Sequence, residues 1–249
     1  MMEGPHNADV VITATYNEAE NLPTLAPQVL AHGVFDLLVV DDNSPDGTGQ
    51  VADDLGHHFP GRIRVLHRPQ KQGLGPALLA GYERALAAGY EHIYQMDADL
   101  SHDPSLLPQL RQALERADAV IASRYVSGGR TVGFSRRRHL LSRLGSAYAG
   151  LLLGLEVHDL TGGYKGFRRQ ALLALHPESI RSSGYAFQIE VTYLLTRGGF
   201  RVVEVPTVFR ERLYGSSKMS WRIVLEALRV TASLRLAQIT PRPIPTGHV

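Results

Sequence analysis

The sequence predicts an α/β fold in which a mostly parallel sheet carries helices on both faces. Short apolar runs that are typical of buried strands alternate with helical stretches along the first half of the chain. Polar residues follow each of these apolar runs. The chain has 249 residues and no Pro/Gly/Ser-rich linker, so we expect one domain spanning residues 1–249.

The expected elements alternate regularly from the N-terminus. Strands are predicted for residues 8–17, 35–42, 62–68, 92–99 and 117–125. Helices are predicted for residues 19–32, where prolines break the helix early, and for 47–59, 75–89 and 103–116. Pro76 falls near the first turn of its helix, where proline is tolerated. In such a sheet, ligands bind at the carboxyl ends of the strands.

Composition excludes several classes of site. The chain has no cysteine, which excludes disulfides, thiolate metal sites and cysteine nucleophiles. The first strand–helix turn lacks the G-x-G-x-x-G pattern, and there is no G-x-x-x-x-G-K-[ST], so dinucleotide and P-loop sites are disfavoured. The N-terminus does not read as an export signal, and the apolar run 147–155 is far shorter than the ~20 residues of a spanning helix. Basic residues cluster at 134–143, but without interleaved aromatic residues, so no nucleic-acid partner is expected.

Polar clusters follow the predicted strands at residues 15–18, 41–48, 97–103 and 123–125. Because the carboxyl ends of parallel strands meet at one edge, we expect these clusters to gather there. A simple turn or capping role would explain one of these clusters well but would explain all four together poorly. For Asp42, which precedes a run of turn-forming residues, a turn role stays an alternative.

Two aspartates, Asp97 and Asp99, stand two residues apart in the segment YQMDADLSHDP. On a strand this spacing would direct both carboxylates to the same side. Paired oxygen ligands suit a divalent cation, Mg²⁺ or Mn²⁺, shared with substrate phosphates. An ordinary turn or a helix cap is the alternative reading of this motif.

Nine segments in collinear order resemble a known family. They are TATYNEAENL, VVDDNSPDGT, GLGPAL, MDADLSHDP, ASRYVSGG, SRLGSA, LTGGYKGFRR, GYAFQIEV and EVPTVFRERLYGSSKM. Together they resemble the polyprenyl-phosphate (dolichol-phosphate) mannose synthases, which are inverting GT-A glycosyltransferases. The resemblance implies a GT-A (Rossmann-like) fold with a C-terminal amphipathic helix. It also implies that mannose is transferred from GDP-mannose to a polyprenyl monophosphate, with a divalent cation as cofactor.

The resemblance also assigns the nucleotide and metal sites. It places the nucleotide against Ala14, where the family usually has proline, and against Tyr16, Glu18, Val40 and Asp42. The family's metal and diphosphate motif falls on Asp97, Ala98 and Asp99, with Ser101 at a position that often carries a metal-binding glutamine.

Basic residues complete the site that the resemblance implies. Arg124 matches an arginine near the donor phosphates, Arg212 and Lys218 match a loop that closes over them, and Arg143 matches an arginine near the acceptor phosphate. With Asp99, these residues are the expected catalytic groups. Isolated surface charges are the alternative, above all for Arg143 and Lys218.

The acceptor chemistry sets a further expectation. A phosphate monoester has a second pKa of about 6, so it is largely a dianion near neutral pH and needs no strong general base. Glu190 and Asp159 are therefore expected mainly to anchor other groups.

A polyprenyl substrate implies a peripheral enzyme on the cytoplasmic side of the membrane. We expect a catalytic core of about residues 8–218 and an interfacial helix of about 219–237; the alternative for this helix is packing on the sheet. The apolar segment 142–155 is a second candidate for contact with the lipid. Transfer of glucose or N-acetylglucosamine from a UDP donor stays open as another activity, as does a nucleotide-sugar-binding module without catalysis.

Overall fold

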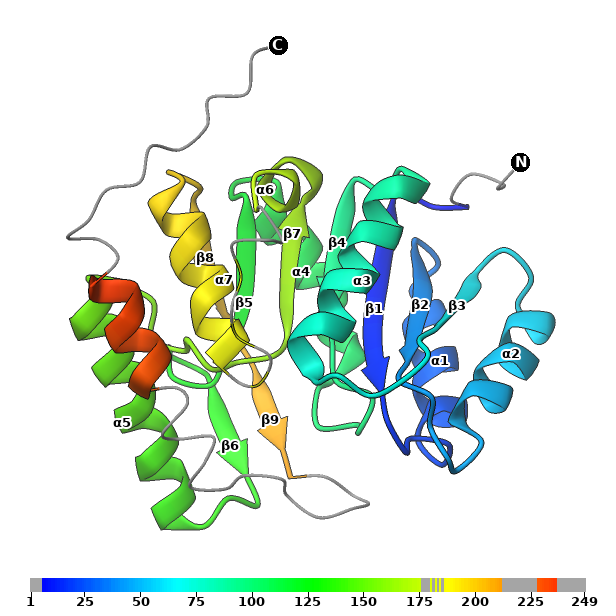
Figure 1. Cartoon of the computed structure of the whole chain (residues 1–249), viewed down its shortest axis with the longest axis horizontal. Coiled ribbons are helices and arrows are strands. Elements are labelled where there is room, and N and C mark those ends of the chain that lie inside the picture. The colour runs from blue at the N-terminus through cyan, green and yellow to red at the C-terminus, as the bar shows by residue number, and fades with distance from the viewer. Residues whose placement is uncertain are drawn as a thin grey trace.

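A seven-stranded mixed sheet forms the centre of the molecule, in a computed structural model that describes residues 6–175, 180, 182, 184, 186–211 and 228–236. Its strand order is β3-β2-β1-β4-β7-β5-β8 (Figure 1). The strands are β1 (Asp9–Thr15), β2 (Phe35–Asp41), β3 (Ile63–His67), β4 (His92–Gln95), β5 (Ala119–Ser123), β7 (Lys165–Arg168) and β8 (Val202–Pro206). A second, two-stranded sheet pairs β6 (Arg130–Val132) with β9 (Val208–Arg210).

Helices cover both faces of the large sheet. They are α1 (Leu22–Leu30), α2 (Thr48–His58), α3 (Leu74–Ala88), α4 (Leu107–Leu114), α5 (Arg136–Leu153), α6 (Arg169–Leu173) and α7 (Ala186–Arg197), with a 3₁₀ turn η1 (Pro104–Leu106) before α4. Residues 228–236 are helical as well. The prediction of an α/β fold with a mostly parallel sheet is confirmed.

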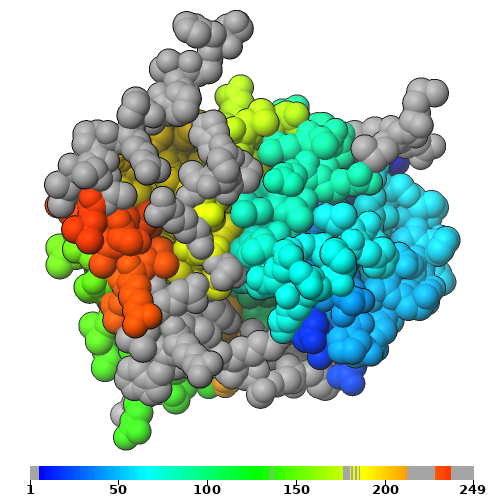
Figure 2. Space-filling view, viewed as in Figure 1, coloured from blue at the N-terminus to red at the C-terminus, as the bar shows by residue number. Residues whose placement is uncertain are grey.

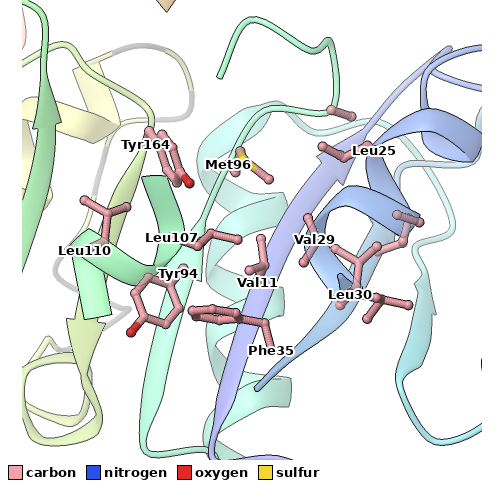
Figure 3. Packing of buried hydrophobic residues seen from close by; sticks show 14 of the residues in the cluster. Val11, Leu25, Val29, Leu30, Phe35, Tyr94, Met96, Leu107, Leu110 and Tyr164 are labelled. Atoms are coloured by element: carbon pink, nitrogen blue, oxygen red, sulfur yellow. The ribbon is translucent and has the colours of Figure 1, made fainter. Parts of the chain in front are cut away.

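Alternating strand residues separate two hydrophobic cores. Val11 of β1 points to the side of α1, α2 and α4, whereas its neighbours Val10 and Ile12 point to the side of α3, α6 and α7. Figure 3 shows the first core, where the rings of Phe35 and Tyr94 meet edge to face at 5.3 Å between centroids. Two buried faces explain why the strand sequences are almost continuously apolar.

Strand β7 runs antiparallel between β4 and β5. It has four residues and contains Gly166, whose missing side chain makes room for Tyr94: a Cβ there would lie 2.7 Å from Tyr94 Cδ1. No strand is predicted for this segment from the sequence, because a short KGFR run that contains glycine and lysine lacks the apolar pattern of a strand.

Helix α1 corrects one local expectation, since its prolines do not break it. Pro23 lies in the first turn, where its missing N–H costs nothing, and Pro27 lies inside the helix. The hydrogen bond that Pro27 cannot make would go to the carbonyl of residue 23, still within the first turns. The buried face of α1, which includes Leu25 and Val29, packs on the sheet and holds the helix together.

The described part of the expected C-terminal helix, residues 228–236, packs on the domain. Leu234 contacts a buried cluster that α5 and α7 form, and its carbonyl oxygen accepts a hydrogen bond of 3.5 Å from Tyr193 Oη. Thr231 is buried, while Arg229 and Leu236 are exposed. Figures 1 and 2 show this segment in orange-red beside the green helix α5. Within the described ranges, no helix has both the length and the hydropathy to cross a bilayer.

Candidate active site

The loops that follow β1 and β2 form one surface at the carboxyl edge of the sheet. Thr15 Oγ1 donates a hydrogen bond of 3.1 Å to Asp41 Oδ1, and the backbone N–H of Glu18 donates one of 2.9 Å to Thr48 Oγ1. Asp46 accepts from the N–H of Ala19 at 3.1 Å. The first two polar clusters of the sequence therefore do meet, as predicted.

The residues expected around the nucleotide differ in what they can offer. Val40 is fully buried in the core, between β1 and β3, and offers no exposed surface to a ligand in this structure, so its predicted contact with the nucleotide stays a prediction. Ala14, on β1, is partly buried. Glu18 Oε2 accepts a hydrogen bond of 2.7 Å from Asn21 Nδ2, which fixes the carboxylate.

Basic residues that the sequence reasoning did not name flank the expected nucleotide site. Lys71 Nζ lies 3.5 Å from the centroid of the Tyr16 ring. The buried carboxylate of Asp42 accepts hydrogen bonds from Arg68 Nη1 and, at 3.4 Å, from the N–H of Gln72. Arg68, Lys71 and Gln72 lie between β3 and α3. Their position directly after a predicted strand is the feature of the sequence that could have identified them as site residues.

The aspartate pair departs from the predicted geometry. Strand β4 ends at Gln95, so Asp97 and Asp99 lie in the following loop and the alternation of a strand does not apply to them. The Asp97 side chain is 36% exposed, whereas Asp99 is 3% exposed. The expectation that both carboxylates emerge on the same side of a strand is therefore wrong, because the strand ends at Gln95, before the chain reaches either aspartate.

The turn after Asp99 is tightly organised. Ser101 donates to Asp99 Oδ1 through its N–H at 3.1 Å and its Oγ at 2.5 Å. Between them, Leu100 has a φ of 59°, a left-handed conformation that costs a non-glycine residue about 1–2 kcal/mol. Backbone strain of this kind gathers at functional sites. Ser101 thus orients the Asp99 carboxylate, and its predicted role as a direct metal ligand stays a prediction.

His102 is a site residue that the sequence reasoning missed. Its Nε2 lies 3.4 Å from Asp97 Oδ2, and its ring packs against Tyr164 and Phe209 at centroid distances of 5.1 and 5.2 Å. The side chain is buried. Its place inside the polar cluster 97–103 was the signal that could have revealed it.

Arg124 forms a buried ion pair with Asp159. Its Nε and Nη2 donate to the two carboxylate oxygens at 2.7 and 2.6 Å, and Nη2 also donates to Thr161 Oγ1 at 2.8 Å. Burial alone would raise the pKa of Asp159, but the hydrogen bonds and the charge of Arg124 outweigh it and hold that pKa below its usual value. These contacts leave Arg124 Nη1 for a ligand. The anchoring role expected for Asp159 agrees with this geometry.

A cavity of about 380 Å³ joins this polar edge to an apolar surface. At its polar end lie Asp97, His102, Arg124 and Gln188. Its other end is lined by Leu141, Leu144 and Tyr148 of α5 and by Leu228 and Thr231 of the C-terminal helix. The cavity therefore has a charged head and an apolar tail.

A second cavity, of about 430 Å³, lies beside the first and shares Arg124 with it. It is basic, since Arg130, His139 and Arg143 also line it. Arg143 is exposed on α5 and does not line the first cavity in this structure. Its predicted contact with an acceptor phosphate stays a prediction.

Helix α7 is tied to the sheet by buried polar groups. Lys165 is fully buried on β7, and its Nζ donates to the Gln188 carbonyl at 2.7 Å and to Thr192 Oγ1 at 2.8 Å. Burial lowers the pKa of this lysine to about 7, against the opposing charge of Asp159. Glu190 accepts from the N–H and the Oγ of Ser182 at 2.9 and 2.6 Å, which agrees with an anchoring role for it.

The donor atoms present fit a divalent cation that is shared with a substrate. Within the ranges that the structure describes, no cluster of three or more His, Cys, Asp or Glu residues could hold a metal by itself. Mg²⁺ is usually bound through one or two carboxylates together with substrate phosphates and water. The exposed Asp97 and the oriented Asp99 match that donor set. Arg212 and Lys218, which are expected on a loop over the phosphates, lie outside the described residues.

Known structures share this fold. Glucosyl-3-phosphoglycerate synthase from Mycobacterium tuberculosis, solved with Mn²⁺, uridine diphosphate and glucosyl-3-phosphoglycerate, superposes with a TM-score of 0.68 at 22% identity; the match covers 95% of this chain and 82% of that one. The same enzyme in complex with phosphoglyceric acid gives a TM-score of 0.68 at 20% identity, over 93% of this chain and 81% of that one. At this identity the likeness shows the GT-A fold.

Sequence comparisons identify the family. The family described as Glycosyl transferase family 2 matches residues 10–175. A polyprenol monophosphomannose synthase of Mycolicibacterium smegmatis is 45% identical over 226 residues, which is 90% of this chain and 85% of that protein. An undecaprenyl-phosphate mannosyltransferase of Micrococcus luteus is 46% identical over 220 residues, which is 88% of this chain and 90% of that protein. The chain therefore belongs to glycosyl transferase family 2 and, within it, to the polyprenyl-phosphate mannose synthases.

Proposed function

We propose that this enzyme transfers mannose, with inversion, from GDP-mannose to a polyprenyl monophosphate. The observation that carries the proposal is the cavity that connects Asp97 and Arg124 with the leucines of α5. A lipid phosphate has the same two parts, an anionic head and an apolar chain. The names of the two relatives, a synthase of polyprenol monophosphomannose and an undecaprenyl-phosphate mannosyltransferase, support this substrate class.

The reaction is a single displacement at the anomeric carbon. An oxygen of the acceptor phosphate forms the new bond to C1 while the bond from C1 to the diphosphate oxygen breaks, and GDP leaves with that electron pair. The attacking dianion carries no proton that must be removed. This agrees with the fact that Glu190 and Asp159 are both engaged in structural hydrogen bonds.

The residues of this chain hold and orient the two anions. Asp97 and Asp99 would bind a divalent cation, Mg²⁺ or Mn²⁺, which when bound neutralises charge on the departing diphosphate. Arg124 is held in place by Asp159, so its Nη1 can meet a phosphate oxygen without reorganisation. We expect Arg143, Arg212 and Lys218 to supply further positive charge, and Tyr16, Glu18 and Asp42 to contact the nucleoside.

Helix α5 supports attachment to a membrane surface. Leu140, Leu144, Tyr148 and Leu151 are 57%, 56%, 41% and 88% exposed and follow one another along one side of the helix. Arg137 is exposed in the first turn of the same helix and Arg143 near its middle. An apolar stripe accompanied by basic residues suits a bilayer interface. We propose peripheral attachment on the cytoplasmic side, which a chain without cysteine fits.

The test is transfer of radiolabelled sugar into lipid that can be extracted with organic solvent. We expect label from GDP-mannose and not from UDP-glucose or UDP-N-acetylglucosamine. Transfer from a UDP donor would overturn the assignment of the donor. Binding of a sugar nucleotide without any transfer would instead indicate a module without catalysis.

A further inference from the structure

One buried amide nitrogen at the first cavity, which Asp97 and Arg124 also line, has no hydrogen-bond partner in the part of the chain that the structure describes. Among the residues that the structure describes, Gln188 Nε2 finds no hydrogen-bond acceptor although the side chain is 1% exposed. An unsatisfied buried donor costs about 1–3 kcal/mol, so it is uncommon without a functional reason. Gln188 is also one of the residues that line the cavity.

A chain of hydrogen bonds fixes which way this amide faces. Gln95 Nε2 donates to the carbonyl oxygen of Gly163 at 2.7 Å, and this oxygen can only accept, so the nitrogen of Gln95 must face it. The Oε1 of Gln95 accepts from Tyr82 Oη. The second N–H of Gln95 then donates to Gln188 Oε1 at 2.8 Å. Gln188 must therefore turn its own NH₂ group, with two donors, away from Gln95.

The backbone of Gln188 is held as firmly as its side chain. Lys165 Nζ and Thr192 Oγ1 both donate to its carbonyl oxygen, at 2.7 and 2.9 Å. The residue lies in the first turn of α7. The free NH₂ group is thus preorganised, and a ligand that meets it need not order it first.

The surroundings indicate what this NH₂ group binds. At this end of the cavity Gln188 is accompanied by Gly162, Gly163 and Ile189, all without charge, while Asp97 supplies a carboxylate and Arg124 a cation. A Cβ on Gly163 would lie 3.5 Å from both carboxylate oxygens of Asp97, so the glycine leaves this side of Asp97 open. Arg124 suits an anion, whereas the neutral NH₂ group of Gln188 beside the carboxylate of Asp97 suits a polyol, whose hydroxyl groups both accept and donate.

We propose that Gln188 Nε2 donates a hydrogen bond to a hydroxyl oxygen of the transferred sugar and thereby contributes to sugar recognition. This inference rests on the proposed function, because it takes the diphosphate to lie at Asp97 and Asp99. The sugar, which is attached to that diphosphate, then reaches the part of the cavity that Gln188 and Gly163 line.

The test compares the binding of GDP-mannose and of GDP, by calorimetry with Mg²⁺ present, for the wild type and for Gln188→Met. Methionine keeps the volume and removes the amide. We expect the Kd of GDP-mannose to rise about ten-fold, as for the loss of one buried hydrogen bond, and the Kd of GDP to stay within about two-fold. Gln112→Ala, at an exposed position on α4, is the control and should change neither value.

Other outcomes overturn the proposal. Equal weakening of GDP and GDP-mannose would make Gln188 a structural residue. Unchanged binding of both, with a raised KM for the lipid phosphate, would make it an acceptor contact.

A second measurement uses deoxy-mannose analogues of GDP-mannose and tests the contact itself. If Gln188 binds one sugar hydroxyl, the analogue that lacks it should bind wild type about ten-fold more weakly than GDP-mannose and should bind wild type and Gln188→Met equally well. If every analogue weakens by the same factor in both proteins, Gln188 makes no contact with the sugar. If wild type binds a UDP-sugar more tightly than GDP-mannose, the proposed donor is wrong. The Kd values of that UDP-sugar and of UDP, measured for wild type and Gln188→Met, then still test whether Gln188 contacts the sugar.

Discussion

Asp97 and Asp99 lie in very different surroundings although one residue separates them. Asp97 is accessible from the cavity, whereas Asp99 is buried and accepts two hydrogen bonds from Ser101. A buried carboxylate that backbone and hydroxyl donors orient costs little to reorganise when a cation binds. In the proposed cation site, Asp99 would be the fixed ligand and Asp97 the accessible one.

Replacement of Asp99 by asparagine should lower transfer at least ~100-fold, because it removes a charged ligand from the proposed cation site. The fold should persist, since the asparagine Oδ1 can still accept from the Ser101 N–H. The measurement is the rate of transfer over a range of Mg²⁺ and Mn²⁺ concentrations, with circular dichroism as the check on folding. Ser101→Ala is the companion variant and should lose less. Activity of Asp99→Asn close to that of wild type, with unchanged metal dependence, would refute the metal assignment.

The Arg124–Asp159 ion pair should make the free energy of unfolding depend on pH in the acidic range. The pKa of Asp159 is lower in the folded protein than its usual value of 3.8. The stability that the pair contributes is therefore fully present above that unfolded value and is lost as the pH falls through the lower, folded pKa. Removal of one partner leaves an uncompensated buried charge, which commonly costs 3–5 kcal/mol.

Urea unfolding of wild type and Asp159→Asn between pH 2.5 and pH 7 tests this expectation. The difference in the free energy of unfolding between the two proteins should shrink as the pH falls below about 4. A difference that stays constant over that range would show that the ion pair does not set the stability. Glu204→Gln is a useful comparison, because Glu204 holds the same loop through the N–H groups of His158 and Asp159 but does not touch Arg124.

At the scale of elements, α5 connects the site with the surface. Its buried side includes Ala149 and Leu153, which pack with α7, while Leu140 and Leu151 project outward. Leucines this exposed, next to a cavity with an apolar end, favour a lipid surface as their partner. The C-terminal segment 228–236 packs against the same cluster and adds Leu228 to the wall of the cavity.

Exchange of Leu140 and Leu151 for serine should lower transfer to long-chain polyprenyl phosphate in vesicles by about ten-fold or more, because burying one leucine contributes about 1.5–3 kcal/mol. Neither residue lines the cavity, so transfer to a short, water-soluble prenyl phosphate should not change. Leu173→Ser, at a position 56% exposed on α6, is the matched control. An equal loss on both acceptors would place these leucines in the fold or in catalysis and not at the membrane.

Strand β7 and helix α7 are joined through the buried Lys165. Because burial lowers its pKa to about 7 from 10.5, the unfolded chain binds more protons than the folded protein at this residue between those two values. The contribution of Lys165 to stability should therefore rise with pH across that window, by at most about 1.4 kcal/mol per pH unit. We expect urea unfolding of wild type and Lys165→Met to show that the free energy of unfolding of wild type, relative to that of the variant, is higher at pH 9 than at pH 6.5. A difference that does not depend on pH would contradict a neutral, buried Lys165.

For the whole molecule, the two sheet halves contribute different parts of the site. Strands β1 and β2 and the loops after them provide the residues expected around the nucleotide, and the loop after β3 adds Arg68 and Lys71. The part that β5, α5 and α7 form provides Arg124, the leucines and Gln188. The aspartates follow β4, next to β7 between the two halves. A donor bound across this edge would contact both halves at once.

Binding of donor and metal should thus stabilise the whole domain. At a ligand concentration about 100 times the Kd, one site adds about 2.7 kcal/mol to the free energy of unfolding. We expect GDP-mannose with Mg²⁺ to raise Tm, and chelation by EDTA to remove most of that increase. Differential scanning fluorimetry with GDP-mannose, UDP-glucose and no ligand measures the effect. A Tm that responds equally to both sugar nucleotides, or that ignores EDTA, would contradict the proposed donor or the proposed cation.

The sequence by itself determined the α/β class, the place of the aspartate pair near the carboxyl end of the fourth strand and, through its collinear motifs, the family. These features can be read from neighbouring residues or from the order of motifs along the chain. A strand that is buried on both faces produces an apolar run, and polar residues follow where the strand ends. Tertiary structure alone decided that β7 enters the sheet antiparallel, that Arg124 is held by Asp159, and that Gln95 directs Gln188. The last two pairs are 35 and 93 residues apart along the chain. A hydrogen bond between such distant residues leaves no periodic pattern in the sequence, since its partners meet only when the strands and helices that carry them have packed.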